Sequence, residues 1–288
     1  MVDLVKIAVD AMGGDGSPKK IIDGIIHNHK SNHENYYQLF GDKNKIIDCI
    51  NDNIDPNHYQ IIDTKNTVKS TDSPLEAAKR GKDTSMWLAI ESVKNKQSDI
   101  VISAGNTGAL LVIAKLNLKM IENIDKPALS ALWPNKKGMS VVLDLGANIE
   151  CSSKNLLDFS VMGASLYKSL YPSENPKVAL LNIGSEELKG NEIIKETFQI
   201  LNDKKNENFD FAGYIEGNEL MNGEVNVIVS DGFTGNVALK TAEGTANFIT
   251  QELKKALGGS ILGKISSLLN ISNLKKFKKR LDPRLYNG

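Results

Sequence analysis

The chain has 288 residues, of which 41% are hydrophobic and 24% charged, so a folded core is expected and general disorder is excluded. The 35 basic side chains balance the 35 acidic ones, which argues against a uniformly basic nucleic-acid-binding protein. Two cysteines supply neither a disulfide framework nor a zinc-binding spacing, and a reducing cytoplasm suits them.

In chain order, short β-branched runs end in loops of Gly, Asn, Asp and Ser, and most of these loops lead into helix-like segments. The expected strands cover residues 6–10, 38–42, 99–103, 140–146, 177–184, 210–217 and 225–231. Several are continuous apolar runs, which is typical of parallel strands covered on both faces. The alternation predicts an α/β fold with a doubly wound, mostly parallel sheet. Ligands bind beyond the carboxyl ends of such strands, where all the glycine-rich loops are expected to lie.

The first of these loops is DAMGGDGSP, residues 10–18. Gly13 and Gly14 allow a tight turn and the close approach of a ligand, and the start of the next helix can hold an anion. A plain turn with Asp15 as the helix cap explains the loop about as well. There is no GxGxxG and no GxxxxGK[ST], so dinucleotides and ATP have no direct motif.

The loop SAGNTGALL, residues 103–111, joins an expected strand to an expected helix. Two glycines remove side-chain bulk, while Ser103, Asn106 and Thr107 supply hydroxyl and amide groups. This combination suits a phosphate or the amide-rich pantetheine of a thiol carrier. The alternative is a helix-capping turn with Asn106 or Thr107 as the cap, and we favour binding over it.

The loop DLGAN, residues 144–148, closes another strand. Asp144 is placed to orient a neighbouring loop, and Asn148 offers both a donor and an acceptor. Cys151 follows without a histidine partner, so we expect it to be a small packing residue rather than a nucleophile.

Two further loops complete the set. NIGSEELKGNE, residues 182–192, places Lys189 beside glycine at a strand end, where it can stabilise an anion or a developing oxyanion. Alone, it would be an ordinary surface lysine; with the other loops at the same edge, the functional interpretation is favoured. SDGFTGNVALKTAEG, residues 230–244, brings Asp231, Thr234 and Asn236 before a helix, and the alternative here is again a capped turn.

Together the loops offer many hydrogen-bond donors, one prominent lysine and no histidine, because all four histidines lie between residues 27 and 58. This set is poor for metal-assisted hydrolysis or a Ser-His-Asp triad. It suits an anion that is itself the nucleophile, such as inorganic phosphate, which needs positioning and donors for an oxyanion. We therefore expect no metal and no cofactor.

The motifs VDAMGGD, SAGNTGAL, DLGAN, LLNIGSEELKGNE and SDGFTGNVALKTAEG, in this order, resemble the phosphate acyltransferase family of bacterial phospholipid synthesis. DPRLYNG at residues 282–288 resembles a segment near the family's C-terminal part, beyond which its members usually continue for some tens of residues. The resemblance implies transfer of a long-chain acyl group from acyl-acyl-carrier protein to inorganic phosphate. It also implies a Rossmann-like fold of the phosphotransacetylase and isopropylmalate-dehydrogenase architecture, a homodimer, and a product passed to a membrane glycerol-phosphate acyltransferase.

Catalytic positions carried over from the family are Lys189, for the charge of phosphate and oxyanion, and Asn236, for hydrogen bonds to the same group. The loops add these expected substrate-binding residues: Asp10, Gly13, Gly14, Asp15, Ser103, Asn106, Thr107, Gly108, Asp144, Asn148, Gly190, Asn191, Asp231, Thr234 and Gly235.

We expect residues 1–288 to form a single α/β/α domain with residues 253–281 as a protruding, basic, amphipathic helical hairpin, divided at Gly258 and Gly259. Residues 253–280 hold no acidic side chain. Dimer packing, an anionic membrane surface and the acidic carrier protein remain equal, compatible explanations. The residues expected to make membrane or carrier contacts are Lys254, Lys255, Leu257, Ile261, Leu262, Ile265, Leu268 and Leu269.

Three other functions stay open at this stage. A phosphotransacetylase acting on short acyl-CoA shares the chemistry, and a nicotinamide-dependent decarboxylating dehydrogenase shares the architecture but needs metal-binding aspartates. A membrane-associated scaffold for lipid synthesis would need no catalysis. No signal peptide and no membrane-spanning run are visible, so we expect a cytoplasmic protein that associates peripherally with the membrane.

Overall fold

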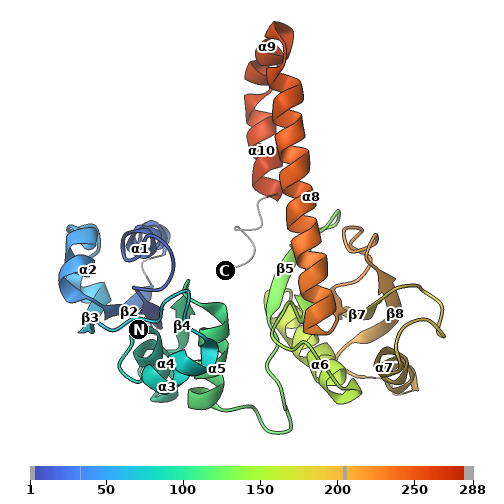
Figure 1. Cartoon of the computed structure of the whole chain (residues 1–288), viewed down its shortest axis with the longest axis horizontal. Coiled ribbons are helices and arrows are strands. Elements are labelled where there is room, and N and C mark those ends of the chain that lie inside the picture. Colours follow the sequence, from blue (N-terminus) through green and yellow to red (C-terminus); the bar gives the residue numbers. More distant parts are fainter. Residues whose placement is uncertain (1–3, 33, 204–205, 282–288) are drawn as a thin grey trace. The chain divides into compact units, whose positions relative to one another are not determined.

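The protein divides into two compact units, Met1–Glu122 and Asn123–Gly288, each with its own sheet (Figure 1). The computed structural model describes residues 4–32, 34–203 and 206–281. One sheet was expected from the sequence, but the strands form two, because strand pairing depends on contacts between distant residues that local patterns do not encode. That the two units act as one acyltransferase domain stays a prediction.

The first unit builds a parallel four-stranded sheet in the order β3-β2-β1-β4. The strand order reverses between β1 and β4, and doubly wound sheets bind ligands at such a point. Its elements are β1 (Val5–Asp10), α1 (Lys19–Ser31), β2 (Asn35–Gly41), α2 (Lys43–Ile50), a 3₁₀ turn (Pro56–His58), β3 (Tyr59–Asp63), α3 (Pro74–Arg80), α4 (Ser85–Lys94), β4 (Ile100–Ser103) and α5 (Thr107–Leu118).

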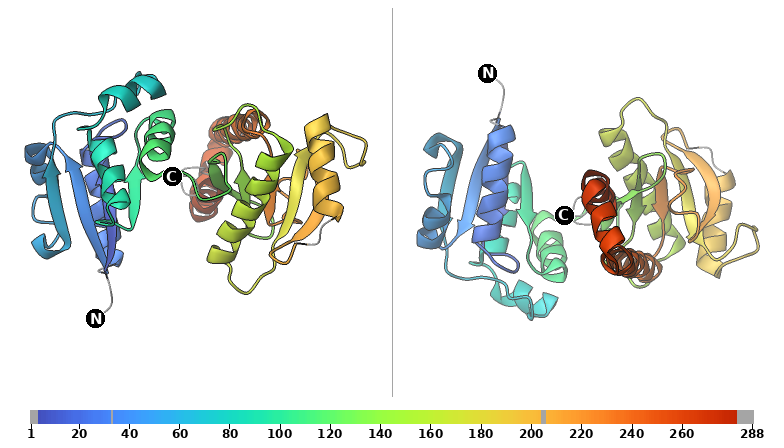
Figure 2. Two further views of the ribbon diagram at one scale, coloured as in Figure 1. Left: turned by 90° about the horizontal axis from the view of Figure 1, so that it is seen from below. Right: turned by 90° about the horizontal axis from the view of Figure 1, so that it is seen from above.

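Helices cover both faces of this first sheet (Figure 2). Successive residues of β1 point to opposite faces: Val9 packs in a cluster with α1 and α2, while Ala8 packs against Ala89 of α4. This explains why residues 7–9 of β1 are all apolar rather than alternating with polar residues.

The second unit has a five-stranded sheet in the order β5-β6-β9-β7-β8, parallel except for the antiparallel edge strand β5. Its elements are β5 (Ser130–Pro134), β6 (Met139–Leu143), α6 (Ser153–Leu170), β7 (Lys177–Asn182), α7 (Glu192–Asp203), β8 (Asp210–Glu216), β9 (Val227–Val229), α8 (Gly232–Gly258), α9 (Ile261–Leu269) and α10 (Ile271–Leu281).

The second sheet also sends alternate side chains to two cores. Val141 packs with Phe159 of α6 on one face, whereas Val142 belongs to a cluster with Trp133 on the other. Leu239 of α8 packs against that second cluster. One face of the sheet therefore carries α6 and α7, and the opposite face carries α8.

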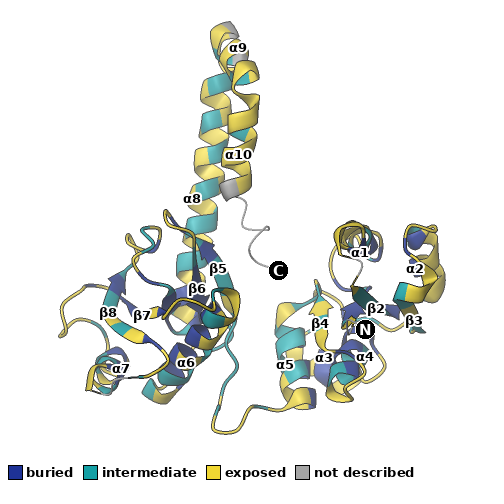
Figure 3. Ribbon diagram, turned by 180° about the vertical axis from the view of Figure 1, so that it is seen from behind, coloured by how far each residue is buried: buried dark blue, intermediate teal, exposed yellow. Residues whose placement is uncertain are grey.

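Helix α8 extends far beyond the sheet, and α10 runs back alongside it (Figures 1 and 3). The division expected at Gly258 and Gly259 is confirmed, because α8 ends at Gly258 and α9 begins at Ile261. The apolar side chains of α9 face solvent, with Leu262 and Leu269 each 80% exposed. Within the described residues, no helix is both long and apolar enough to cross a bilayer. The DPRLYNG segment and the side chain of Ile261 lie outside the described residues.

Candidate active site

The five candidate loops lie at the carboxyl edges of two sheets, two in the first unit and three in the second. In the first unit, the loops after β1 and β4 meet because these strands are neighbours. Gly13 and Gly14 are packed so closely on the second loop that a β-carbon on Gly14 would lie 2.4 Å from the carbonyl oxygen of Ala104. Their close approach serves the packing of one loop on the other.

Asp10, the last residue of β1, links these two loops by a hydrogen bond from Ser103. Its side chain is 2% exposed, and its carboxylate accepts hydrogen bonds from Ser85 Oγ at 2.6 Å and Ser103 Oγ at 2.7 Å. Asp10 and Ser103 were expected to bind substrate; these contacts direct their side chains to one another, and substrate binding by them stays a prediction. Ser85, at the start of α4, was missed because no loop motif contains it.

Asn106 is the N-cap of α5. Its Oδ1 accepts a hydrogen bond from the backbone N–H of Ala109 at 3.1 Å, and its Nδ2 donates to the carbonyl of Asp72 at 2.9 Å. The capping alternative therefore describes this side chain. Thr107 and Asp15 are exposed, which leaves their side chains accessible to a ligand, whereas Gly108 packs against Pro74.

In the second unit, three candidate loops follow the neighbouring parallel strands β6, β9 and β7. The backbone N–H of Gly232 donates to the carbonyl of Asn148 at 2.8 Å, which ties the start of α8 to the loop after β6. A β-carbon on Gly235 would lie 1.9 Å from the carbonyl oxygen of Asp144, so only glycine fits. Asn236 lies beside Gly146 and is exposed.

Asp144 organises the loop after β6 and is completely buried. One carboxylate oxygen accepts from the backbone N–H groups of Leu129, Gly146 and Ala147 at 3.0–3.2 Å. The other accepts both the backbone N–H and the side-chain amide of Asn148 at 2.8 Å. Asp144 thus orients its loop, as the sequence suggested, and both its oxygens are engaged within the protein.

The loop that carries Lys189 is folded around Asn182, the last residue of β7. Its amide donates to the carbonyls of Gly184 and Lys189, both at 3.1 Å. Gly190 has φ of +97°, where a β-carbon would lie 2.5 Å from Asn182 Oδ1. Asn191 Oδ1 accepts from the N–H of Ile194 at 2.9 Å. The side chain of Lys189 is exposed and has no ion pair among the described residues.

Asp231 and Thr234 serve the start of α8. Asp231 accepts from the backbone N–H and the hydroxyl of Thr234, both at 2.8 Å. The capped-turn alternative therefore describes these two side chains. Of the functional groups expected at this edge, Lys189, Asn191 and Asn236 are exposed, and Asn236 lies near the N-terminal, positive end of the α8 dipole.

Cys151 is the nearest thiol to this edge. It is buried in the core, as the sequence predicted, and burial together with the negative charge of Asp144 raises the pKa of its thiol. A raised pKa disfavours the thiolate, which is the nucleophilic form. The edge therefore provides an exposed cation and an amide without an activated thiol.

Comparison with known proteins decides the family. A family model described as "Fatty acid synthesis protein" matches residues 5–288. The chain is 77% identical over 288 residues to the phosphate acyltransferase of Pelagibacter ubique, covering 100% of this chain and 86% of that relative. The chain belongs to the phosphate acyltransferase family. It is therefore an acyltransferase, as the motifs predicted.

More distant members of the family agree. The phosphate acyltransferase of Maricaulis maris is 41% identical, with 100% of this chain and 83% of that protein covered. Among solved structures, the EutD phosphotransacetylase from Staphylococcus aureus matches with a TM-score of 0.61, covering 85% of this chain and 83% of its own at 16% identity. A phosphotransacetylase from Streptococcus pyogenes matches with a TM-score of 0.62 at 15% identity, covering 84% and 82%. These structural matches confirm the Rossmann-like, doubly wound fold class.

Proposed function

We propose that this protein transfers a long-chain acyl group from acyl-acyl-carrier protein to inorganic phosphate, and so supplies acyl phosphate for phospholipid synthesis. The family's name gives the acyl transfer to phosphate. The observation that carries the proposal is the edge formed by the loops after β6, β9 and β7. There, Lys189 and Asn236 are exposed, and the nearby thiol of Cys151 is buried.

The reaction is a direct displacement. An oxygen of hydrogen phosphate attacks the thioester carbonyl, the new C–O bond forms, and the C–S bond breaks. The carrier leaves as a thiolate and takes up the proton that the phosphate carried. Phosphate already bears negative charge at neutral pH, so the protein needs to position it and stabilise the tetrahedral oxyanion. A ternary complex follows, because no protein group stores the acyl chain.

Lys189 supplies positive charge to the phosphate and the oxyanion, and Asn236 donates a hydrogen bond to the same group. Buried groups hold both in place: Asn182 fixes the backbone carbonyl of Lys189, and Asp144 fixes the loop beside Asn236. Within the first unit, Asp10, Ser103 and Asn106 support their own loops in the same way, and the side chain of Thr107 is exposed.

The decisive assay is acyl-phosphate formation from palmitoyl-acyl-carrier protein and phosphate, with acetyl-CoA as the competing donor. Lys189→Ala should lower kcat/KM by on the order of 10²–10³, as the loss of an oxyanion contact does. Lys240→Ala, an exposed lysine paired with Glu243 on α8, is the matched control and should leave the rate unchanged. Turnover of acetyl-CoA alone would show that the protein is a short-chain phosphotransacetylase instead. If neither donor is turned over, the non-enzymatic scaffold for lipid synthesis would be the remaining function.

We further propose that the protein works as a cytoplasmic homodimer that associates peripherally with anionic membranes through α8–α10, next to a membrane glycerol-phosphate acyltransferase. Exposed Leu262, Ile265 and Leu269 share one side of α9, and basic residues such as Lys254 and Lys275 flank it. Lys255 is paired with Glu252 at 2.6 Å, and Leu257 is half-buried, so both contribute less to such a surface.

A vesicle-pelleting experiment tests the membrane contact. Leu262→Asp with Leu269→Asp should release the protein from anionic vesicles, whereas Asn247→Asp on α8 should not. If the double variant pellets with vesicles as well as the parent protein does, α9 does not contact the membrane. The exposed side of α9 would then contact the carrier protein or a second copy of the chain.

A further inference from the structure

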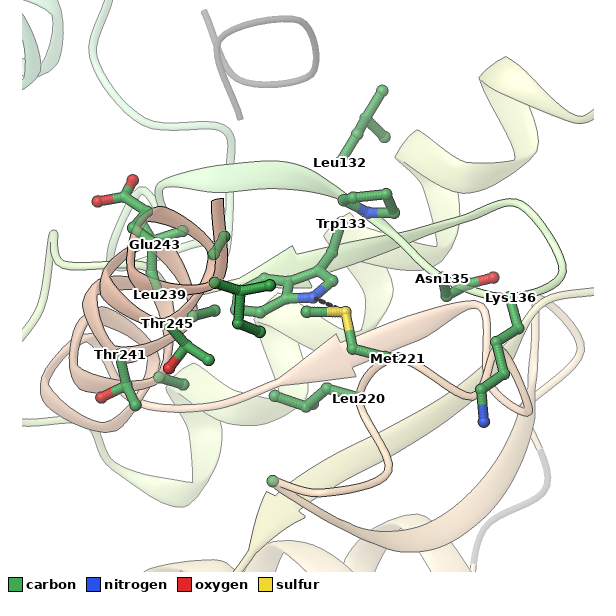
Figure 4. A pocket seen from close by; sticks show the side chains of 16 residues that line it. Leu132, Trp133, Asn135, Lys136, Leu220, Met221, Leu239, Thr241, Glu243 and Thr245 are labelled. Carbon is green, nitrogen blue, oxygen red and sulfur yellow. Dashed lines mark hydrogen bonds between the residues drawn. The ribbon is translucent and has the colours of Figure 1, made fainter. Parts of the chain in front are cut away.

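The second unit contains an apolar groove on the face of its sheet that carries α8 (Figure 4). Its volume is about 640 Å³, within the range of small-molecule sites. Trp133 lies at its centre and is 4% exposed, with its indole N–H donating to Met221 Sδ at 3.0 Å. Leu132 and Leu220 add to the lining.

The α8 wall of the groove is made largely of small side chains. Ala238, Ala242 and Ala246 recur every four residues and so lie on one side of the helix. They leave space between α8 and the segment that contains Leu220 and Met221. Polar groups in the lining are few, which suits a ligand that makes no hydrogen bonds.

The lining residues come from β5 and the turn after it, from the segment between β8 and β9, and from α8. At one end the groove is lined by Gly217, which follows the last residue of β8, opposite Asn182 in the sheet register. Ala238 of α8, two residues after Asn236, also lines the groove. At the other end Lys136 lines it, beyond Pro134, which pairs with the first residue of β6. Gly217 thus brings the lining to the carboxyl end of β8, next to β7, whose loop carries Lys189.

We infer that this groove binds the hydrocarbon chain of the acyl donor, with the thioester at the Gly217 end and the chain extending along Trp133 toward Ile249. The inference rests on the proposed function, since it assigns a subsite to that reaction's substrate. An acetyl group would leave such a groove empty, whereas a long alkyl chain matches its apolar lining and its extent. Each methylene buried there adds about 0.8 kcal/mol, so binding should tighten roughly three- to fourfold per methylene until the groove is full.

The test uses fluorescence of the full chain. The protein has two tryptophans, Trp87 and Trp133, so Trp87→Phe leaves Trp133 as the reporter. Octanoate, decanoate and dodecanoate are titrated below their micelle concentrations, and brominated dodecanoate is used as a contact quencher. We expect saturable quenching and an affinity that rises by roughly tenfold with each added pair of methylenes.

Two variants locate the site. Ala246→Phe, made in the Trp87→Phe protein, should weaken dodecanoate binding at least tenfold by filling the groove, and Ala246→Leu should weaken it less. Asn247→Phe, on the exposed side of α8, should stay within twofold. Thermal unfolding of each variant confirms that it folds. In the wild-type background, Ala246→Phe should also lower the ratio of palmitoyl to butyryl turnover.

The inference is overturned if bromine does not quench Trp133, or if affinity is the same for all three chain lengths. It is also overturned if Ala246→Phe dissociates a dimer without changing chain binding, because a second copy of the protein would then cover the groove. The binding assay needs no turnover. Quenching without acyl-phosphate formation would therefore contradict the proposed reaction but support chain binding in the groove. Acyl-phosphate formation without quenching would support the reaction but contradict chain binding in the groove.

Discussion

At the scale of single residues, most polar groups in the candidate loops hold the loops rather than face solvent. The side-chain oxygens of Asp10, Asn106 and Asp144 accept hydrogen bonds from neighbouring N–H or hydroxyl groups. Lys189 and Asn236 are exposed. The sequence could suggest the capping role of Asn106, because Asn before a helix has that preference. It could not show that Asp10 reaches Ser85, because that contact spans 75 positions.

Asp144 should be the most sensitive of these supports. Asp144→Asn replaces a charged acceptor of five N–H bonds with an amide that presents hydrogens to donors. We expect the free energy of unfolding in urea to fall by about 2–3 kcal/mol. Asp125→Asn, which breaks an exposed ion pair with Lys154, should cost less than about 1 kcal/mol. Equal losses in the two variants would contradict the role of Asp144.

Tyr167 gives the fold a dependence on alkaline pH. Its hydroxyl donates to Glu174 Oε2 at 2.6 Å and accepts from Asn226 Nδ2 at 2.8 Å. Burial, and then the hydrogen bond to Glu174, raise the pKa of Tyr167 to about 12. In the unfolded chain tyrosine titrates near pH 10, so the folded state holds the proton more tightly and this contribution to stability is present below that pH.

As the pH rises from about 10 through 12, the unfolded chain loses this proton more readily than the folded protein does. The free energy of unfolding therefore falls over this range. The free energy of unfolding, measured with urea, should therefore fall more steeply with pH for the wild type than for Tyr167→Phe. The other groups that titrate at alkaline pH are the same in both proteins. Parallel curves for the two proteins would show that Tyr167 does not contribute.

At the scale of elements, the seven strands expected from apolar runs are all present, with ends shifted by up to three residues. Strands β3 and β5 were missed because neither is a continuous apolar run: β3 contains Gln60 and Asp63, and β5 begins with Ser130 and ends with Pro134. The hairpin was expected to begin at residue 253, but α8 runs unbroken from Gly232 to Gly258. The middle of α8 is long and polar, so the local sequence pattern does not predict that the helix is continuous.

The fit of α8 to the loop after β6 depends on Gly235. Gly235→Ala would drive a β-carbon into the Asp144 carbonyl, so we expect a loss of stability of more than about 2 kcal/mol together with loss of activity. Gly244→Ala, nine residues on in the same helix and in open space, should instead stabilise by about 0.5–1 kcal/mol. Thermal unfolding compares them, and a neutral Gly235→Ala would show that α8 can shift away.

At the scale of the whole molecule, the motifs identified the family while the arrangement of strands escaped them. Five loops were expected at one sheet edge, and the structure distributes them over two sheets. A loop sequence records which strand it follows but not which strands lie beside it. In the second unit, β9 lies between β6 and β7 although it follows both in the chain. This insertion brings the loops of Asp144, Lys189 and Asn236 to neighbouring strands.

In the proposed reaction, phosphate itself attacks the thioester, and no acyl group is stored on the protein. Intact-mass measurement after incubation with palmitoyl-acyl-carrier protein, first without and then with phosphate, tests this most directly. We predict an unmodified protein and no released carrier until phosphate is added, and then stoichiometric acyl phosphate and free carrier. A palmitoyl adduct on the protein before phosphate is added, on Cys151 or any other side chain, would contradict the claim.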